Sequence, residues 1–178
     1  MALLDEFEFF SPALWLAGGV CLLIPRSRGG RLRRRLLQCV GISVGGGTTI
    51  SGPLRIEGCR RPGSLLTIGE GCTIGSGVLF DLGDRIDVGR NSVIENEVAL
   101  ITTSHEIGTS SQRAGAMKNR PIVVGHDCRV GARATILQGV TLGAGSVVYP
   151  GSVVVANVEA NTRVSGIPAK ALNVPSPD

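Results

Sequence analysis

The chain has 178 residues, of which 43% are hydrophobic and only 3% aromatic, and it contains 26 glycines. This apolar content excludes a disordered chain, and the length suits one domain with small appendages. The formal net charge is +4, but six arginines are concentrated in residues 26–35 without interleaved aromatic side chains. The charge pattern therefore gives no support for nucleic-acid binding.

The first 41 residues are predicted to form a helical lead-in. Their apolar run, residues 13–24, is shorter than the roughly 20 residues that cross a bilayer, and it follows acidic residues instead of the basic start of a signal peptide. One reading is a pair of helices, the second around Leu32 and Leu36, that covers the open end of a coil. The other is an anchor in the membrane interface, with its arginines on anionic headgroups. We favour the first, because an open solenoid end must be capped.

The main body of the chain follows a six-residue period. Between residues 122 and 155 an aliphatic side chain recurs without a gap, at Val124, Val130, Ile136, Leu142, Val148 and Val154. Neither a helix nor a single strand has this period, whereas short strands broken by tight turns do. The same period runs from Val44 to Leu100, with one poor step at Pro62 and two extra residues in 81–87. The pattern predicts an all-β fold, a parallel β-helix of hexapeptide repeats over residues 42–157, followed by a tail at 158–178.

The period is interrupted between residues 106 and 121. There the in-phase positions are Glu106, Gln112 and Lys118, which cannot face a dry core. We expect an extended loop thrown out of the coil. Loops of this length inside a compact repeat are commonly functional, so the sequence predicts the site near this loop.

The five cysteines are odd in number and include no CxxC pair. Cys72 and Cys128 fall on the small inward position that precedes the aliphatic one by two residues, and both are predicted to be core thiols. This cysteine usage indicates a reducing, cytoplasmic setting and no structural zinc.

The chain contains only two histidines, His105 and His126. His105 stands where the coil ends and the loop departs, and there a neutral imidazole can accept a proton. Asp87 precedes it by one complete coil of three repeats. In a regular stack this places Asp87 one rung away, about 4.8 Å, able to orient the imidazole. Asp87 can equally be a solvated turn residue, and His126 is interpreted as a surface residue.

Several segments resemble the hexapeptide-repeat acyltransferases, close to the maltose, galactoside, nodulation and polysaccharide O-acetyltransferases. They are Ser104-His105-Glu106, the coils of residues 125–154 and the closing residues 166–170, and the resemblance extends over about residues 25–172. It implies a left-handed β-helix of triangular section. It also implies a homotrimer with each site between adjacent subunits, and an extended loop that reaches toward the neighbour.

The resemblance also implies a chemistry. His105 would take the proton of an acceptor hydroxyl as the oxygen attacks the thioester of acetyl-CoA, and a backbone N–H would stabilise the oxyanion, with no metal and no covalent acyl-enzyme. The residues implied to contact coenzyme A are Ala132, Pro150 and Gly151 for the pantetheine arm, and Ala169 and Lys170 for the adenine and phosphates.

The chain departs from the family pattern at three positions. Arg129 stands where relatives commonly carry tryptophan, and Ala156 stands where many carry a lysine. Gly77 replaces an asparagine of the sugar-acetylating members, which undermines maltose or galactoside as the acceptor. Candidates for binding acceptor hydroxyls are Asp81, Asp84 and Arg113, each of which can also be an ordinary solvated turn or loop residue.

The sequence thus predicts an acetyl-CoA-dependent O-acetyltransferase that modifies a sugar, a polysaccharide precursor or a glycoconjugate. We expect it in the cytoplasm, and its N-terminal segment leaves open a peripheral contact with the inner membrane surface. The alternatives are an N-acetyltransferase acting on an amino sugar or xenobiotic and a non-catalytic hexapeptide scaffold. A γ-type carbonic anhydrase is excluded because it needs three zinc-binding histidines.

Overall fold

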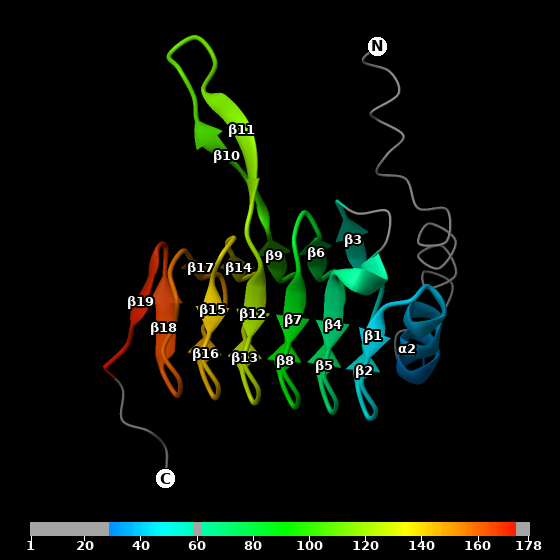
Figure 1. Cartoon of the computed structure of the whole chain (residues 1–178). Coiled ribbons are helices and arrows are strands. Elements are labelled where there is room, and N and C mark those ends of the chain that lie inside the picture. The colour runs from blue at the N-terminus through cyan, green and yellow to red at the C-terminus, as the bar shows by residue number, and fades with distance from the viewer. Residues whose placement is uncertain (1–28, 59–61, 174–178) are drawn as a thin grey trace, which may run out of the picture.

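The computed structural model describes residues 29–58 and 62–173, and it shows a parallel β-helix with three faces (Figure 1). The predicted left-handed coil of hexapeptide repeats is confirmed. The first face consists of β1 (Ser43–Val44), β4 (Leu66–Ile68), β7 (Ile86–Val88), β12 (Ile122–Val124) and β15 (Thr141–Leu142).

The second and third faces complete each turn of the coil. The second face consists of β2 (Thr49–Ile50), β5 (Thr73–Ile74), β8 (Val93–Ile94), β13 (Arg129–Val130), β16 (Val147–Val148), β18 (Arg163–Gly166) and β19 (Ala169–Ala171). The third consists of β3 (Arg55–Glu57), β6 (Leu79–Asp81), β9 (Ala99–Ile101), β14 (Thr135–Ile136) and β17 (Val153–Val154). A short 3-10 helix, η2 (Pro62–Ser64), precedes β4. We call the junction of the first and second faces the first corner, that of the second and third faces the second corner, and that of the third and first faces the third corner.

The core is a stack of aliphatic layers. Every in-phase aliphatic from Val124 to Val154 is at most 2% exposed, and the small residues two places earlier are equally buried. Layers of this kind bury apolar surface only against the layers above and below, so each coil depends on its neighbours.

A ladder of hydroxyl and thiol groups lines the inside of the first corner. Its members are Thr48, Cys72, Ser92, Cys128 and Ser146, all buried. Ser92 is typical: its Oγ donates to the carbonyl of Gly125 at 2.8 Å and accepts the N–H of Cys128 at 3.1 Å. The predicted core thiols are confirmed, and burial raises the pKa of the Cys72 thiol, which keeps it protonated and unreactive.

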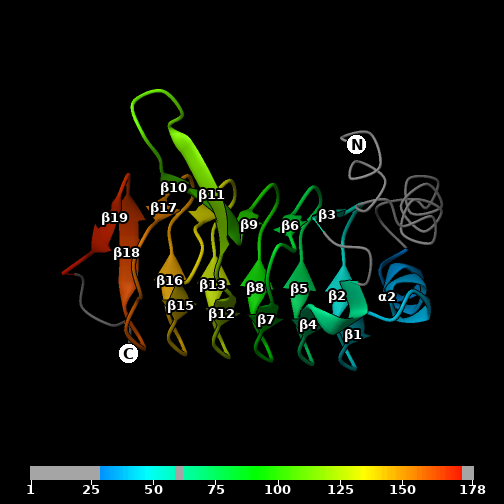
Figure 2. The ribbon, with the colours of Figure 1, turned by 45° about the horizontal axis from the view of Figure 1, so that its top comes forward.

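The helix α2 (Gly30–Cys39) closes the N-terminal end of the coil by packing on β1 and β2, as Figure 2 shows. Leu37 and Arg33 are its buried residues, and a guanidinium nitrogen of Arg33 donates to the carbonyl of Ile50 at 3.2 Å. The second predicted helix is therefore present as an end cap. The apolar run 13–24, and with it the membrane-anchor reading, lies outside the described residues. Within them, no helix combines the length and apolar character needed to cross a bilayer.

The expected loop is a β-hairpin that stands away from the coil (Figures 1 and 2). Its antiparallel strands are β10 (Thr103–Ile107) and β11 (Ala114–Asn119). The hairpin starts three residues earlier than the period break suggests, because β10 follows β9 almost directly. His105 therefore lies inside a strand of the hairpin and not at the strand-to-loop corner of the coil.

The coil also continues beyond the predicted boundary at residue 157. Val158 bridges Leu142, β18 pairs with β16, and β19 folds back antiparallel on β18. The inward residues of this last coil are Val158 and Val164, whereas the six-residue period points to the exposed Ala160. The third corner is two residues shorter in this coil, so the inward residues no longer follow the six-residue period. For this reason the sequence pattern predicted a tail instead of a further coil.

The first-corner ladder yields a stability prediction. We expect Ser92→Ala to lower the free energy of unfolding by about 1–3 kcal/mol, because it leaves the buried N–H of Cys128 and the partly buried carbonyl of Gly125 without this partner. Ser92→Cys is the matched control, since a thiol there can donate to the Gly125 carbonyl as Cys72 and Cys128 donate to those of Gly89 and Gly143. Thermal and urea unfolding at one protein concentration measure the difference. Equal stability of Ser92→Ala and wild type would show that the ladder is not stabilising.

Candidate active site

His105 is oriented by the hairpin itself. It pairs with Met117 across the two strands, and the register then shifts so that Ile107 pairs with Ala114. Residues 115 and 116 thus lie opposite the single residue 106. This arrangement is a β-bulge, which changes the direction of nearby side chains and backbone groups. The carbonyl oxygen of Gly115 lies 3.0 Å from the His105 Nδ1 atom. A carbonyl can only accept, so in the neutral imidazole Nδ1 carries the proton and Nε2 presents a lone pair.

The root of the hairpin is tied to the turn between β6 and β7. The Asp81 carboxylate accepts the N–H of Thr103 at 2.9 Å, and the Thr102 hydroxyl donates to the Asp81 carbonyl at 2.6 Å. The Asn119 side chain donates to the carbonyl of Gly83 at 2.9 Å. A Cβ atom at Gly83 would collide with the Thr103 hydroxyl, so this close approach requires glycine.

The predicted acceptor-binding residues lie around this hairpin. Asp81 anchors the hairpin root, as described, and the Asp84 carboxylate accepts the N–H of Arg85 at 2.6 Å. Both carboxylates thus have a structural partner within the chain. Arg113 is exposed at the far end of the hairpin, where its carbonyl accepts the N–H of Gly108 at 3.0 Å. Their part in acceptor binding stays a prediction.

The expected rung geometry between Asp87 and His105 is wrong. Asp87 lies on the first face, opposite Thr67 and Val123, and its carboxylate pairs with Arg85 at 2.9 Å. His105 lies outside that ladder, because among the described strands β10 pairs with β11 alone. A count of eighteen residues predicts a rung neighbour only where both residues belong to the unbroken coil, and the hairpin takes His105 out of it.

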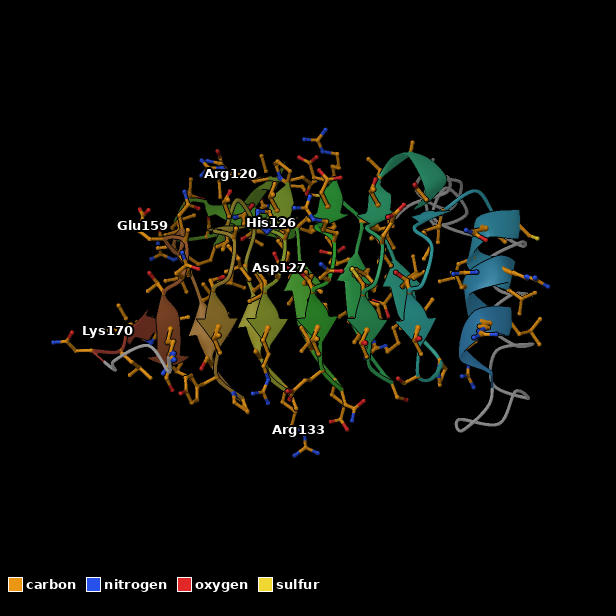
Figure 3. All side chains as sticks on the ribbon, turned by 90° about the horizontal axis from the view of Figure 1, so that it is seen from below. Arg120, His126, Asp127, Arg133, Glu159 and Lys170 are labelled. Atoms are coloured by element: carbon orange, nitrogen blue, oxygen red, sulfur yellow. The ribbon has the colours of Figure 1, made fainter. Side chains whose placement is uncertain are left out.

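The residues expected at the pantetheine arm lie together at the second corner. The N–H of Gly151 donates to the carbonyl of Ala132 at 2.9 Å, so the turns that contain them stack directly, and Pro150 is exposed beside Gly151. Ala169 and Lys170 lie in β19 at the end of the coil, and Figure 3 shows Lys170 pointing away from that end.

A carboxylate that the sequence did not single out organises this second corner. Glu95 accepts the Ala132 N–H at 2.9 Å and pairs with the Arg129 guanidinium at 2.7 and 2.8 Å. The hydrogen bond from Arg129 lowers the pKa of the Glu95 carboxyl, and the Ala132 N–H acts in the same direction. The partners were missed because the hairpin separates Glu95 and Ala132 along the chain.

The two groups of candidates occupy different edges of one chain. The hairpin and His105 leave the coil at the third corner, whereas Ala132 and Gly151 lie at the second corner, across the third face. In Figure 3, Arg120 at the hairpin root and Arg133 beside Ala132 lie at opposite edges of the molecule. A single chain therefore does not bring the candidate base and the candidate coenzyme A turns together. Within residues 29–58 and 62–173 no cluster of three or more His, Cys, Asp or Glu side chains could hold a metal ion.

The coil is similar in sequence to known proteins. The family model described as hexapeptide repeat of succinyl-transferase matches residues 66–101 and 121–156, on both sides of the hairpin. The galactoside O-acetyltransferase of Escherichia coli strain K12 is 27% identical over 126 residues, which are 60% of this chain and 62% of that protein. A 2,3,4,5-tetrahydropyridine-2,6-dicarboxylate N-acetyltransferase of Clostridium perfringens is 42% identical over 69 residues, 37% of this chain and 29% of that protein.

Similarity to a solved structure extends over most of the chain. A hexapeptide-repeat-containing acetyltransferase from Vibrio cholerae, solved in complex with acetyl coenzyme A, is 29% identical and superposes with a TM-score of 0.74 over 90% of this chain and 86% of that one. The chain spans less than two thirds of the length of the curated relatives described above. The chain thus carries two stretches of the hexapeptide repeat, folds into the three-faced coil expected of it, and is similar to acetyltransferases built on this repeat.

Proposed function

We propose that this protein is an acetyl-CoA-dependent O-acetyltransferase, with a hydroxyl of a sugar, a polysaccharide precursor or a glycoconjugate as the acceptor. The observation that carries the proposal is the His105 imidazole, whose Nδ1–H is held by the Gly115 carbonyl while Nε2 has no partner within the described residues. In the neutral imidazole, this is the tautomer that a general base acting through Nε2 requires. Relatives with acetyl-transfer activity support the donor.

The reaction then follows from the placement of the proton. Nε2 of His105 accepts the proton of the acceptor hydroxyl as its oxygen attacks the thioester carbonyl of acetyl-CoA. The Nδ1–H bond to Gly115 keeps the ring in position and stabilises the imidazolium that forms. Collapse of the tetrahedral intermediate releases coenzyme A, whose sulfur takes the proton back from Nε2. The acceptor carries the acetyl ester.

Acetyl-CoA would lie along the second corner, where the turns of Ala132 and Gly151 stack. The N–H of Ala132 is already bonded to Glu95, and the N–H of Gly151 to Ala132. The second corner therefore offers hydrogen-bond acceptors to a ligand more readily than hydrogen-bond donors. Its best candidate is the carbonyl of Pro150, which accepts no hydrogen bond within the described residues. An amide N–H of the pantetheine arm is the complementary group. Ala169 and Lys170 remain candidates for the adenine and phosphates.

We further propose a homotrimer. The distribution of candidates over two edges supports it, because a neighbouring copy can present its second corner to the hairpin of the first. Closed symmetry repeats this contact for every subunit. The exposed Ile107 and Met117 of the hairpin supply apolar area for such a contact, with 89% and 59% of their surface accessible in one chain.

The setting proposed is the cytoplasm. The two buried thiols, Cys72 and Cys128, are free, as expected in a reducing compartment.

The second candidate is N-acetylation, which the Clostridium perfringens N-acetyltransferase favours through its 42% identity over 69 residues. An amine acceptor would use the same base to remove its proton after attack. Mass spectrometry of products formed from hydroxyl and amino sugars separates the two, because an ester is cleaved by mild alkali and an amide is not.

The role of His105 is tested by substitution. We expect His105→Ala to keep the fold and coenzyme A binding while kcat falls by on the order of 10² to 10⁴, the range for a lost general base. His126→Ala is the matched control. It removes the second histidine of the chain, which lies at the first corner, and should leave kcat unchanged. Calorimetric titration with acetyl-CoA and steady-state rates provide the readouts. Near-wild-type turnover of His105→Ala would rule out the role, and absence of coenzyme A binding in wild type would favour the scaffold reading.

The shared site is tested by mixing subunits. We expect a solution mass of three times 18.5 kDa by light scattering. Ala132→Trp should block the second corner, and His105→Ala should remove the base, so each homotrimer is inactive. Co-assembled one to one, they should recover roughly a quarter of wild-type activity, because some sites then combine an intact hairpin with an intact neighbour. No recovery in mixed trimers would place both parts of the site in one chain.

The Glu95 network predicts a pH dependence of stability. The pKa of the Glu95 carboxyl is lower in the folded protein than its ordinary value of 4.5. The ionised carboxylate therefore stabilises the fold at pH values above 4.5, and this stabilisation is lost as the pH falls through the pKa of the folded state. We expect Glu95→Gln to lower the melting temperature by a constant amount between about pH 5 and pH 7, and the difference from wild type to shrink in more acidic solution. Glu57→Gln, which breaks the exposed Arg55–Glu57 pair, is the control with little effect. A difference that persists unchanged in acid would exclude ionisation of Glu95 as the cause.

A further inference from the structure

A pocket of about 280 Å³ lies on the second face near the C-terminal end of the coil. It is lined by Arg129, Val147, Val148, Tyr149, Pro150 and Arg163, which come from β13, β16, β18 and the turn after β16 (Figure 1). The strand register places Arg129 opposite Val147 and Val147 opposite Arg163. Two arginines thus stand two rungs apart, about 10 Å along the coil, with a valine between them.

The two arginines differ in their charge partners. Arg129 is neutralised by Glu95 at 2.7 Å. Arg163 is half-buried, and within the described residues it forms no ion pair or hydrogen bond through its side chain. A guanidinium that is partly withdrawn from water has lost hydration without gaining an anion. The pocket therefore carries one uncompensated positive charge.

The remaining residues that line the pocket indicate what kind of molecule could carry the bound anionic group. Tyr149 is 38% exposed, and its hydroxyl has no hydrogen-bond partner within the described residues. Val147 and Pro150 add apolar lining. The pocket thus combines a forked cationic donor, a phenol donor and apolar surface, which together suit an oxyanion attached to a less polar body.

We propose that this pocket binds an oxyanion, a phosphate or carboxylate group, held by the guanidinium of Arg163 with the Tyr149 hydroxyl as a second donor. The group can come from two sources, the phosphates of coenzyme A or an anionic group of the acceptor. Both are substrates of the proposed reaction, so the identity of the ligand rests on the proposed function, whereas the existence of the site does not.

Calorimetric titration of the full chain with inorganic pyrophosphate tests the site directly. We expect Arg163→Gln to weaken pyrophosphate binding about 10- to 100-fold, the range for a lost charge-assisted hydrogen bond, and Arg163→Lys to weaken it less. Arg90→Gln is the matched control, because it removes the same charge from an exposed arginine at the first corner. Thermal unfolding checks that each variant is folded. No pyrophosphate binding by wild type, or equal binding by wild type and Arg163→Gln, would overturn the proposal.

Two further ligands identify the source of the oxyanion. If it belongs to coenzyme A, Arg163→Gln weakens coenzyme A to the same degree as pyrophosphate but leaves pantetheine, which has no phosphate, unchanged. If it belongs to the acceptor, coenzyme A binds Arg163→Gln like wild type and does not displace pyrophosphate. Should wild type bind pyrophosphate but no coenzyme A, the proposed transfer reaction fails while the oxyanion site stands.

Discussion

Each coil of this protein is stable only against the coils above and below it, and the rest of the structure follows from that dependence. Each short strand points one aliphatic side chain inward, and these side chains form layers that bury their apolar surface against the layers of the coils above and below. The two ends of the stack must therefore be covered. The helix α2 covers the first end, and β18 with β19 closes the other. A stack of this kind is rigid along its length, which makes it a suitable mount for groups that need fixed positions.

Regularity of the coil is what allows the hairpin to project without disturbing it. The strands before and after the insertion, β9 and β12, remain paired on both sides with neighbouring coils. The polar groups exposed by the departure are satisfied at the root by Asp81, Thr102 and Asn119. The bulge then turns the Gly115 carbonyl toward His105. Backbone hydrogen bonding, and not a neighbouring carboxylate, thus sets the tautomer of the imidazole.

The proposed homotrimer would join the two edges over which the candidate site is divided. Within one coil, the candidate base on the hairpin and the candidate binding corner lie across a face from each other, whereas a second copy could bring its corner to the hairpin. On the second face, Glu95 pairs with Arg129 and accepts the Ala132 N–H, whereas Arg163, two strands beyond Arg129, has no ion-pair partner among the described residues. The electrostatic asymmetry of the second face is therefore a property of how residues from three coils are stacked.

The sequence by itself determined the coil, its inward residues and the interruption at the hairpin, because a six-residue period is local information that each repeat carries. It also isolated His105, through the scarcity of histidine and the position of the break. Only the tertiary structure decided which residues meet between coils. The Asp87 rung was mispredicted because the hairpin removes His105 from the ladder, and the C-terminal coil was mistaken for a tail because its corner is two residues shorter. The contacts of Glu95 with Ala132 and of Arg163 with the pocket join residues far apart along the chain, and stacking of coils creates such contacts without leaving a periodic signal.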